Sequence, residues 1–182
     1  RRVELELWKK IRTMARKGRR TGLGITAEGD MLAALGLRYG TPEATAFAVK
    51  VQKTLALEAY RASVKMAAER GAFEIFDARK EEKNPMIGRI READPELYAE
   101  MVKHGRRNIA MLTIAPTGTT SLMSQTTSGI EPVFRPVYKR RRKINPSDQD
   151  AKVAFVDDMG EKFEEYNVYH HNFVKWLEAN GY

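Results

Sequence analysis

The most informative part of this chain is Asn108-Ile-Ala-Met-Leu-Thr-Ile-Ala-Pro-Thr-Gly-Thr-Thr-Ser-Leu-Met123. Its apolar run from Ile109 to Ile114 contains β-branched residues and predicts a short buried strand. Pro116 ends the run, because proline cannot donate a hydrogen bond to a neighbouring strand. A hydroxyl-rich turn around Gly118 follows, and a helix is expected to begin near Ser121. A strand, a glycine turn and a helix in this order favour an α/β fold.

The turn carries the groups that bind an anion. Because Gly118 has no side chain, a ligand can approach its backbone closely, and successive backbone N–H groups can converge on phosphate oxygens. Hydroxyl donors flank it at Thr117, Thr119, Thr120 and Ser121. The alternative is an ordinary strand-to-helix turn in which a hydroxyl caps the helix and binds nothing, and spacing alone favours it. No Gly-Lys-Ser/Thr is present, so the loop is not that of a nucleoside triphosphatase.

Composition bounds the class of protein. With 182 residues and 42% hydrophobic content the chain can bury a core as one domain, and its net charge of +8 favours an anionic partner. No apolar run approaches the ~20 residues that cross a bilayer, and no signal peptide is recognisable, so we expect a cytoplasmic protein. The absence of cysteine excludes disulfides, thiolate metal sites and any cysteine radical or redox chemistry carried by this chain.

Capping signals and apolar periodicity predict several helices. Thr41-Pro42-Glu43 begins a long helix that ends at Gly71, and Asp94-Pro95-Glu96 begins a shorter one that ends at Gly105. A further short helix is expected over residues 30–35. A helix as long as the one ending at Gly71 suits the outer layer of a large barrel or a helical partner.

The N-terminal helix is expected to pack against other elements, because its apolar residues fall on one stripe: Val3, Leu7, Trp8, Ile11 and Met14. Residues 78–91 are predicted to form a polar loop. With no internal repeat and no low-complexity linker, the chain is expected to be one structural unit, residues 1–182. A boundary near Asn145–Asp148 would separate a peripheral tail, residues 145–182.

Three further patterns suggest binding sites, and each has a plainer explanation. The glycines between positions 22 and 29 lack the Gly-x-Gly-x-x-Gly spacing of a dinucleotide site. The run Arg135–Lys143 has six cations in nine positions and would suit a phosphate backbone, but a solvated edge strand has the same pattern. Adjacent His170 and His171 point in different directions on a strand or a helix, so we predict no metal site there. Asp30 is interpreted as an ordinary solvated acid.

Two longer segments carry a family resemblance: Ala115-Pro-Thr-Gly-Thr-Thr-Ser-Leu-Met123 and Thr127-Ser-Gly-Ile-Glu-Pro-Val-Phe134. Together they closely resemble the catalytic α chain of adenosylcobalamin-dependent (class II) ribonucleotide reductases. The resemblance continues upstream through Arg19–Gly40 and downstream through Tyr138–Pro146, and so covers most of the chain. The loop and the Ser-Gly-Ile-Glu-Pro motif are quite specific, whereas the helices between them would fit many proteins.

The resemblance implies a fold, a function and a set of binding residues. The fold is a ten-stranded α/β barrel of two antiparallel half-barrels, to which this chain would contribute some strands and long outer helices. Reductases of this family convert ribonucleotides to deoxyribonucleotides for DNA synthesis, with adenosylcobalamin as cofactor and a ribonucleoside diphosphate as substrate. The residues expected to line the substrate diphosphate are Pro116, Thr117, Gly118, Thr119 and Thr120. Ser121 and Glu131 would support this loop, Glu131 by accepting backbone hydrogen bonds.

The same resemblance places the chemistry outside this chain. The family's radical cysteine lies in an Asn-x-Cys-x-Glu setting that would precede Arg1, so the chain is expected to be the C-terminal part of the barrel, without a catalytic residue and inactive alone. An upstream catalytic segment or an N-terminal partner chain would supply the cysteines and most of the cobalamin contacts. The chain would then be either a natural subunit of a split enzyme or a fragment of a longer catalytic chain. Two alternatives stay open: a non-enzymatic basic module that binds nucleic acid or a protein, and an inert fragment whose exposed edges pair nonspecifically.

Overall fold

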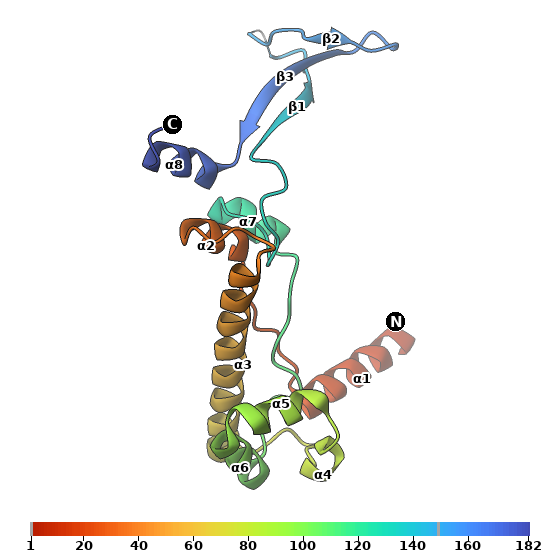
Figure 1. Ribbon diagram of the computed structural model, residues 1–182. Coiled ribbons are helices and arrows are strands. Elements are labelled where there is room, and N and C mark those ends of the chain that lie inside the picture. The colour runs from red at the N-terminus through yellow and green to blue at the C-terminus, as the bar shows by residue number, and fades with distance from the viewer. Residues whose placement is uncertain (1, 149) are drawn as a thin grey trace. The chain divides into compact units, whose positions relative to one another are not determined.

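The computed structural model describes residues 2–148 and 150–182 and shows a mixed α/β chain (Figure 1), so the predicted fold class is confirmed at this level. Its elements, in chain order, are α1 (Arg2–Gly18), α2 (Glu28–Ala34), α3 (Pro42–Arg70), α4 (Ala78–Glu81), α5 (Pro85–Ala93), α6 (Pro95–His104), α7 (Gly118–Ser124), β1 (Val137–Lys143), β2 (Phe155–Val156), β3 (Lys162–Tyr169) and α8 (His171–Ala179). Among the described residues, no helix has the length and apolar character that crossing a membrane requires.

The chain forms two compact units, and each is made from two separate segments. The first unit combines the chain up to Ile25 with Gly40–Ala115, and the second combines Thr26–Tyr39 with Pro116–Tyr182. The boundary predicted near Asn145–Asp148 lies inside the second unit rather than between the two.

The two main helices of the first unit begin and end where local signals predict. α3 starts at the cap Thr41, whose Oγ1 accepts a backbone hydrogen bond at 3.3 Å, and it ends at Gly71 with a φ of 81°. α6 starts at Asp94, whose carboxylate accepts a backbone hydrogen bond at 2.9 Å, and it ends at Gly105 with a φ of 72°. Each cap satisfies an N–H group that the helix leaves without a partner, and each glycine adopts a positive φ that other residues avoid.

The polar loop predicted at residues 78–91 is wrong. This region forms α4 after the cap Asp77, and α5 after the cap Asn84. Ile87 and Ile90 lie on one side of α5 and are buried. Two apolar residues three positions apart do not stand out from the charged residues around them, although they hold this short helix against the core.

One hydrophobic core joins three helices of the first unit. Its buried members are Tyr60, Val64, Ile87, Ile90, Leu97, Met101 and Met111. Burial of a large apolar side chain contributes roughly 1.5–3 kcal/mol. The core therefore holds α3, α5 and α6 together with the extended chain around Met111.

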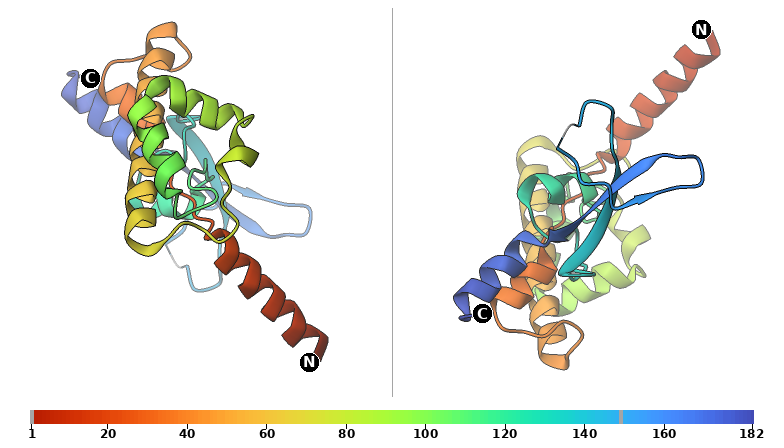
Figure 2. Two further views of the ribbon diagram at one scale, coloured as in Figure 1. Left: turned by 90° about the horizontal axis from the view of Figure 1, so that it is seen from below. Right: turned by 90° about the horizontal axis from the view of Figure 1, so that it is seen from above.

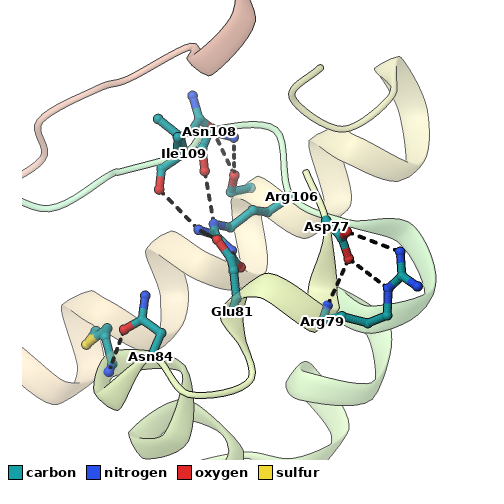
Figure 3. A network of polar contacts seen from close by, with 9 residues as sticks. Asp77, Arg79, Glu81, Asn84, Arg106, Asn108 and Ile109 are labelled. Atoms are coloured by element: carbon teal, nitrogen blue, oxygen red, sulfur yellow. Dashed lines mark hydrogen bonds and ion pairs between the residues drawn. The ribbon is translucent and has the colours of Figure 1, made fainter. Parts of the chain in front are cut away.

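A buried arginine connects this core to the segment that follows α6 (Figure 3). The Arg106 guanidinium forms a bidentate ion pair with Glu81. It also donates to the main-chain oxygens of Asn108 and Ile109, both at 3.1 Å. Its central carbon lies 5.4 Å from the centre of the Phe73 ring, within range of a cation–π interaction. These contacts determine the path of the chain into the predicted strand.

The predicted strand from Ile109 to Ile114 is extended, and its described residues form a single β-bridge, parallel, between Leu112 and Leu23. Next to the bridge, the Thr113 N–H donates to the main-chain oxygen of Leu23 at 3.0 Å. A Cβ on Gly24 would lie 2.3 Å from the main-chain oxygen of Thr113, so this position requires glycine. Gly24 thus serves the close approach of two chain segments rather than a dinucleotide.

The apolar stripe of α1 does not pack within the described part of the chain. α1 extends away from the other helices of its unit (Figure 2), and its stripe residues are exposed, Val3 to 83% and Trp8 to 61%. The prediction of a packed helix is wrong for the described chain, because amphipathic periodicity shows which face a helix would bury but not whether a partner is present.

The second unit contains α2, α7, α8 and an antiparallel three-stranded sheet with the strand order β1-β3-β2. β1 pairs along its whole length with β3, from Val137 opposite Tyr169 to Lys143 opposite Phe163. β1 is therefore an edge strand, in agreement with the plainer explanation of its basic sequence.

Candidate functional site

The predicted anion loop centres on Thr117, which adopts an unusual backbone conformation. Its φ of 49° and ψ of 27° are left-handed, a region that β-branched residues rarely enter and that costs about 1–3 kcal/mol. The Gly129 N–H donates to Thr117 Oγ1 at 2.7 Å, and Thr26 Oγ1 lies 2.9 Å from the same oxygen. Thr26 also donates to the main-chain oxygen of Thr127 at 3.2 Å, so the hydroxyl proton between the two threonines comes from Thr117. Both hydrogen-bonding functions of this hydroxyl are used inside the protein.

The residues after Thr117 leave their backbone donors free of intrahelical bonds. In α7 the first intrahelical donor is the Ser121 N–H, which reaches the Thr117 main-chain oxygen at 2.8 Å. The three preceding N–H groups, from Gly118 to Thr120, have no helical acceptor, and the Thr117 side chain does not cap them. Gly118, Thr119 and Thr120 are exposed, and a Cβ built on Gly118 would meet nothing within 4 Å. The loop therefore presents three consecutive N–H donors beside open space.

Of the two residues expected to support the loop, Ser121 contacts it through its side chain, whereas the main chain of Glu131 packs against α2. The buried Ser121 hydroxyl donates to the Gly118 main-chain oxygen at 2.8 Å. The Glu131 side chain is exposed, and among the described residues we find no hydrogen bond to its carboxylate, which differs from the expected role. A Cβ on Gly29 would lie 2.5 Å from the Glu131 main-chain oxygen and 2.7 Å from Pro132 Cα. The Glu131–Pro132 backbone thus packs directly on α2 at a glycine.

A network around Asp30 was not predicted. The Asp30 carboxylate accepts hydrogen bonds from the Thr127 N–H at 3.0 Å and the Asn172 amide at 2.7 Å, and His170 Nε2 lies 3.0 Å from its other oxygen. Burial raises the pKa of Asp30, but the hydrogen bonds from Thr127, Asn172 and His170 outweigh it and hold the pKa below its ordinary value. Asp30 is therefore ionised, and His170 Nε2 is the donor.

The interpretation of Asp30 as a solvated acid is wrong, since its side chain is 15% exposed and that of His170 is 16% exposed. His170 stands at the start of α8. No spacing rule connects residues 140 positions apart, so the sequence carried no signal for this pair. Within the described residues, no group of three or more His, Cys, Asp or Glu residues could hold a metal ion.

Four of the six cations of the basic run, Arg135–Lys143, are paired with acidic side chains. The acids belong to the second unit, and the ion pairs are Lys139 and Arg141 with Glu165, Arg142 with Glu164 and Asp148, and Lys143 with Glu161. Exposed pairs of this kind contribute little stability, but they lower the net charge that a nucleic acid would meet. This pairing of charges disfavours the alternative in which the chain is a non-enzymatic basic module that binds nucleic acid.

Residues 4–175 match the family described as ribonucleotide reductase, barrel domain. The chain belongs to this family. It is 36% identical over 127 residues to the vitamin B12-dependent ribonucleoside-diphosphate reductase of Mycobacterium tuberculosis strain H37Rv, a match that covers 69% of this chain and 15% of the relative. It is 33% identical over 171 residues to the reductase of the same name from Thermoplasma acidophilum, covering 94% of this chain and 19% of the relative.

A third relative, the ribonucleoside-diphosphate reductase subunit alpha of Treponema pallidum, is 30% identical over 134 residues, covering 69% of this chain and 15% of the relative. The chain thus spans less than a fifth of the length of these ribonucleotide reductases. The resemblance stated from the loop motifs is confirmed, and the family match includes the whole loop and its supporting residues.

Proposed function

We propose that this chain contributes the substrate diphosphate-binding loop of an adenosylcobalamin-dependent ribonucleotide reductase, an enzyme that converts ribonucleotides to deoxyribonucleotides for DNA synthesis. Membership of the ribonucleotide reductase barrel family and the names of the relatives support the reaction and the cofactor class. The observation that carries the loop assignment is the left-handed backbone of Thr117. The Gly129 N–H donates to the Thr117 hydroxyl, and three exposed residues with free backbone N–H donors follow Thr117 in the chain.

In this proposal Pro116, Thr117, Gly118, Thr119 and Thr120 line the substrate diphosphate. Thr117 contributes its conformation, since its hydroxyl is used by Gly129 and Thr26. The N–H groups of Gly118, Thr119 and Thr120 donate to phosphate oxygens, and the exposed hydroxyls of Thr119 and Thr120 add further donors. Ser121 supports the loop through the hydrogen bond from its hydroxyl to the Gly118 main-chain oxygen.

The physical role of the loop is positioning. Holding the diphosphate places the ribose against a reactive group supplied elsewhere, and a misplacement of ~1 Å costs on the order of a hundredfold in rate. The chain has no cysteine, so it contributes no thiyl radical and no redox pair. The proposed partner is therefore an upstream catalytic segment or an N-terminal chain, and the proposed compartment is the cytoplasm.

One groove of the first unit is too small to hold adenosylcobalamin. This groove, beside α3 and α6, has a volume of about 280 Å³ and is lined partly by the charged side chains of Arg61, Glu96 and Glu100. Pockets for ligands much smaller than a cobalamin already occupy ~300–1,000 Å³. By its resemblance to the family, we place the cofactor mainly on the upstream part of the enzyme.

We also propose that the extended pairing around Leu23 and Leu112, together with the β1–β3 hairpin, belongs to the ten-stranded barrel of this family. The parallel direction of the first pair and the antiparallel direction of the second are observed. Short parallel pairs become stable when further strands and covering helices bury both faces of the sheet. In the whole enzyme, long helices such as α3 would form the outer layer.

The loop assignment is tested by the substitution Gly118→Ala. Gly118 has no positive φ and no neighbour within 4 Å of a built Cβ, so alanine fits the fold and is expected to keep or slightly raise its stability. The added methyl group occupies the open space where a phosphate would lie. We expect binding of ADP and of inorganic pyrophosphate, measured by titration calorimetry, to weaken about tenfold or more.

The matched control is Gly88→Ala, because Gly88 in α5 also has no positive φ and no neighbour within 4 Å of a built Cβ. This variant should bind both ligands like the wild type. Absence of binding by the wild type, or equal affinity in Gly118→Ala, would contradict the loop assignment. The reductase assignment is tested separately, by deoxynucleotide formation with adenosylcobalamin and a dithiol, comparing the upstream catalytic segment with and without this chain.

A further inference from the structure

The loop that carries Thr117 is held by a chain of contacts that ends at α8. The Gly129 N–H holds Thr117, and Gly129 follows closely on Thr127. The Thr127 N–H donates to Asp30 at 3.0 Å, and the Asp30 N–H donates to Thr127 Oγ1 at 3.3 Å. These reciprocal bonds tie the segment after α7 to the first turns of α2.

Asp30 is itself oriented by the C-terminal segment. His170 Nε2 lies 3.0 Å from Asp30 Oδ1, and the Asn172 amide lies 2.7 Å from Oδ2. The His170 N–H also donates to the main-chain oxygen of Pro136 at 2.8 Å, which fixes the turn between β3 and α8. All of these groups belong to the second unit, so the contacts form one continuous path within it.

These contacts restrain Thr117, whose left-handed backbone is unfavourable without them. A left-handed threonine persists only where surrounding bonds hold it, and the bonds to Thr117 come from Gly129 and Thr26. If Asp30 loses its partners, the segment around Thr127 and Gly129 is less restrained, and Thr117 can relax to an ordinary φ. The three N–H donors that follow Thr117 would then no longer converge.

We infer that Asp30 is a positioning residue for the diphosphate loop, and that His170 and Asn172 set the affinity of the loop for phosphate by holding the Asp30 carboxylate in place. This inference rests on the proposed function of the loop. A ligand that binds only the held conformation loses affinity in proportion to the fraction of molecules in that conformation. Loss of one charge-assisted hydrogen bond is expected to weaken binding on the order of tenfold.

The experiment uses the full chain and four variants. Asp30→Asn removes the charge, His170→Ala removes the donor, and His170→Gln retains a donor that reaches a similar distance. His171→Ala is the matched control, because this neighbouring histidine is exposed and belongs to the same helix start. Thermal melting of each variant separates loss of fold from loss of positioning.

Two readouts are measured on each variant: the affinity for inorganic pyrophosphate by calorimetry, and the amide hydrogen exchange of Thr127 and Gly129 without ligand. We expect Asp30→Asn and His170→Ala to bind about tenfold more weakly and to exchange both amides faster, while His170→Gln and His171→Ala stay close to the wild type. The exchange readout is independent of any ligand.

The results distinguish a failure of the function proposed for the loop from a failure of the role inferred for Asp30. A wild-type chain that binds no pyrophosphate refutes the function proposed for the loop, and the exchange of the Gly129 amide then still tests the positioning path. Unchanged Gly129 exchange in His170→Ala overturns the inference in either case. Equal weakening in His170→Ala and His171→Ala would also overturn it, because the effect would then come from the start of α8 in general.

Discussion

Replacement of Arg106 by methionine is expected to destabilise the first unit strongly. Methionine fills much of the same volume beside the aromatic rings but has no charge and no donor. The Arg106 side chain is 3% exposed and that of its partner Glu81 is 18% exposed. The substitution therefore leaves a largely buried carboxylate without its counter-charge (Figure 3).

The magnitude follows from the contacts. Removal of one partner of a buried ion pair costs about 3–5 kcal/mol. The main-chain oxygens of Asn108 and Ile109 lose their donors as well, at about 1 kcal/mol each because a carbonyl can accept other bonds. The expected loss of about 5–7 kcal/mol is comparable to the whole stability of an ordinary domain, which is about 5–15 kcal/mol.

The assay is urea denaturation followed by circular dichroism, since the first unit is mainly helical. The double variant Arg106→Met with Glu81→Leu removes the isolated carboxylate and should recover about 2 kcal/mol relative to the single variant. The control is Arg79→Met, because Arg79 is a highly exposed arginine paired with Asp77 and its loss should leave the unfolding midpoint unchanged.

The reasoning is refuted if Arg106→Met loses less than about 1 kcal/mol, the size of an exposed ion pair. It is also refuted if the double variant is less stable than the single one. That result would mean that the Glu81 carboxylate finds adequate solvation without the arginine, and that the burial of the pair is energetically unimportant.

Three other predictions concern backbone strain and acid stability, each measured from urea unfolding. Ala27→Gly should stabilise the chain by about 0.5–1 kcal/mol, because Ala27 has a φ of 65°, and an equal or lower midpoint would contradict this. Gly24→Ala should destabilise it by about 2 kcal/mol or more, because the new Cβ would lie 2.3 Å from the Thr113 oxygen; a smaller loss would mean that the two segments separate easily. Since the folded pKa of Asp30 is held below its ordinary value of 3.8, the stability from its bonds is present above that value and is lost as the pH falls through the folded pKa. Stability should therefore fall less steeply below about pH 4 in Asp30→Asn than in the wild type, and identical acid profiles would oppose it.

Local signals explain why some elements could be predicted. The starts of α3 and α6 depend on a cap, a proline and an acid within four residues, and their ends depend on one glycine with a positive φ. Such rules act between near neighbours and are visible in the sequence. The α4–α5 region shows the limit of this approach, because Ile87 and Ile90 are informative only once the core that buries them is known.

The sequence alone predicted the starts and ends of α3 and α6 and, through the family motifs, membership of the ribonucleotide reductase barrel family. It placed the start of α7 near Ser121, three residues after the observed start at Gly118. The tertiary structure was needed to show that the Thr117 hydroxyl is used internally, that Asp30 contacts His170, and that Arg141 and Arg142 of β1 pair with Glu165 and Glu164 of β3. Residues that share a helical turn are brought together by the backbone itself, whereas Asp30 and His170 meet only because two distant segments pack in one unit. Spacing along the chain carries no information about such a meeting, because it depends on the packing of the whole unit.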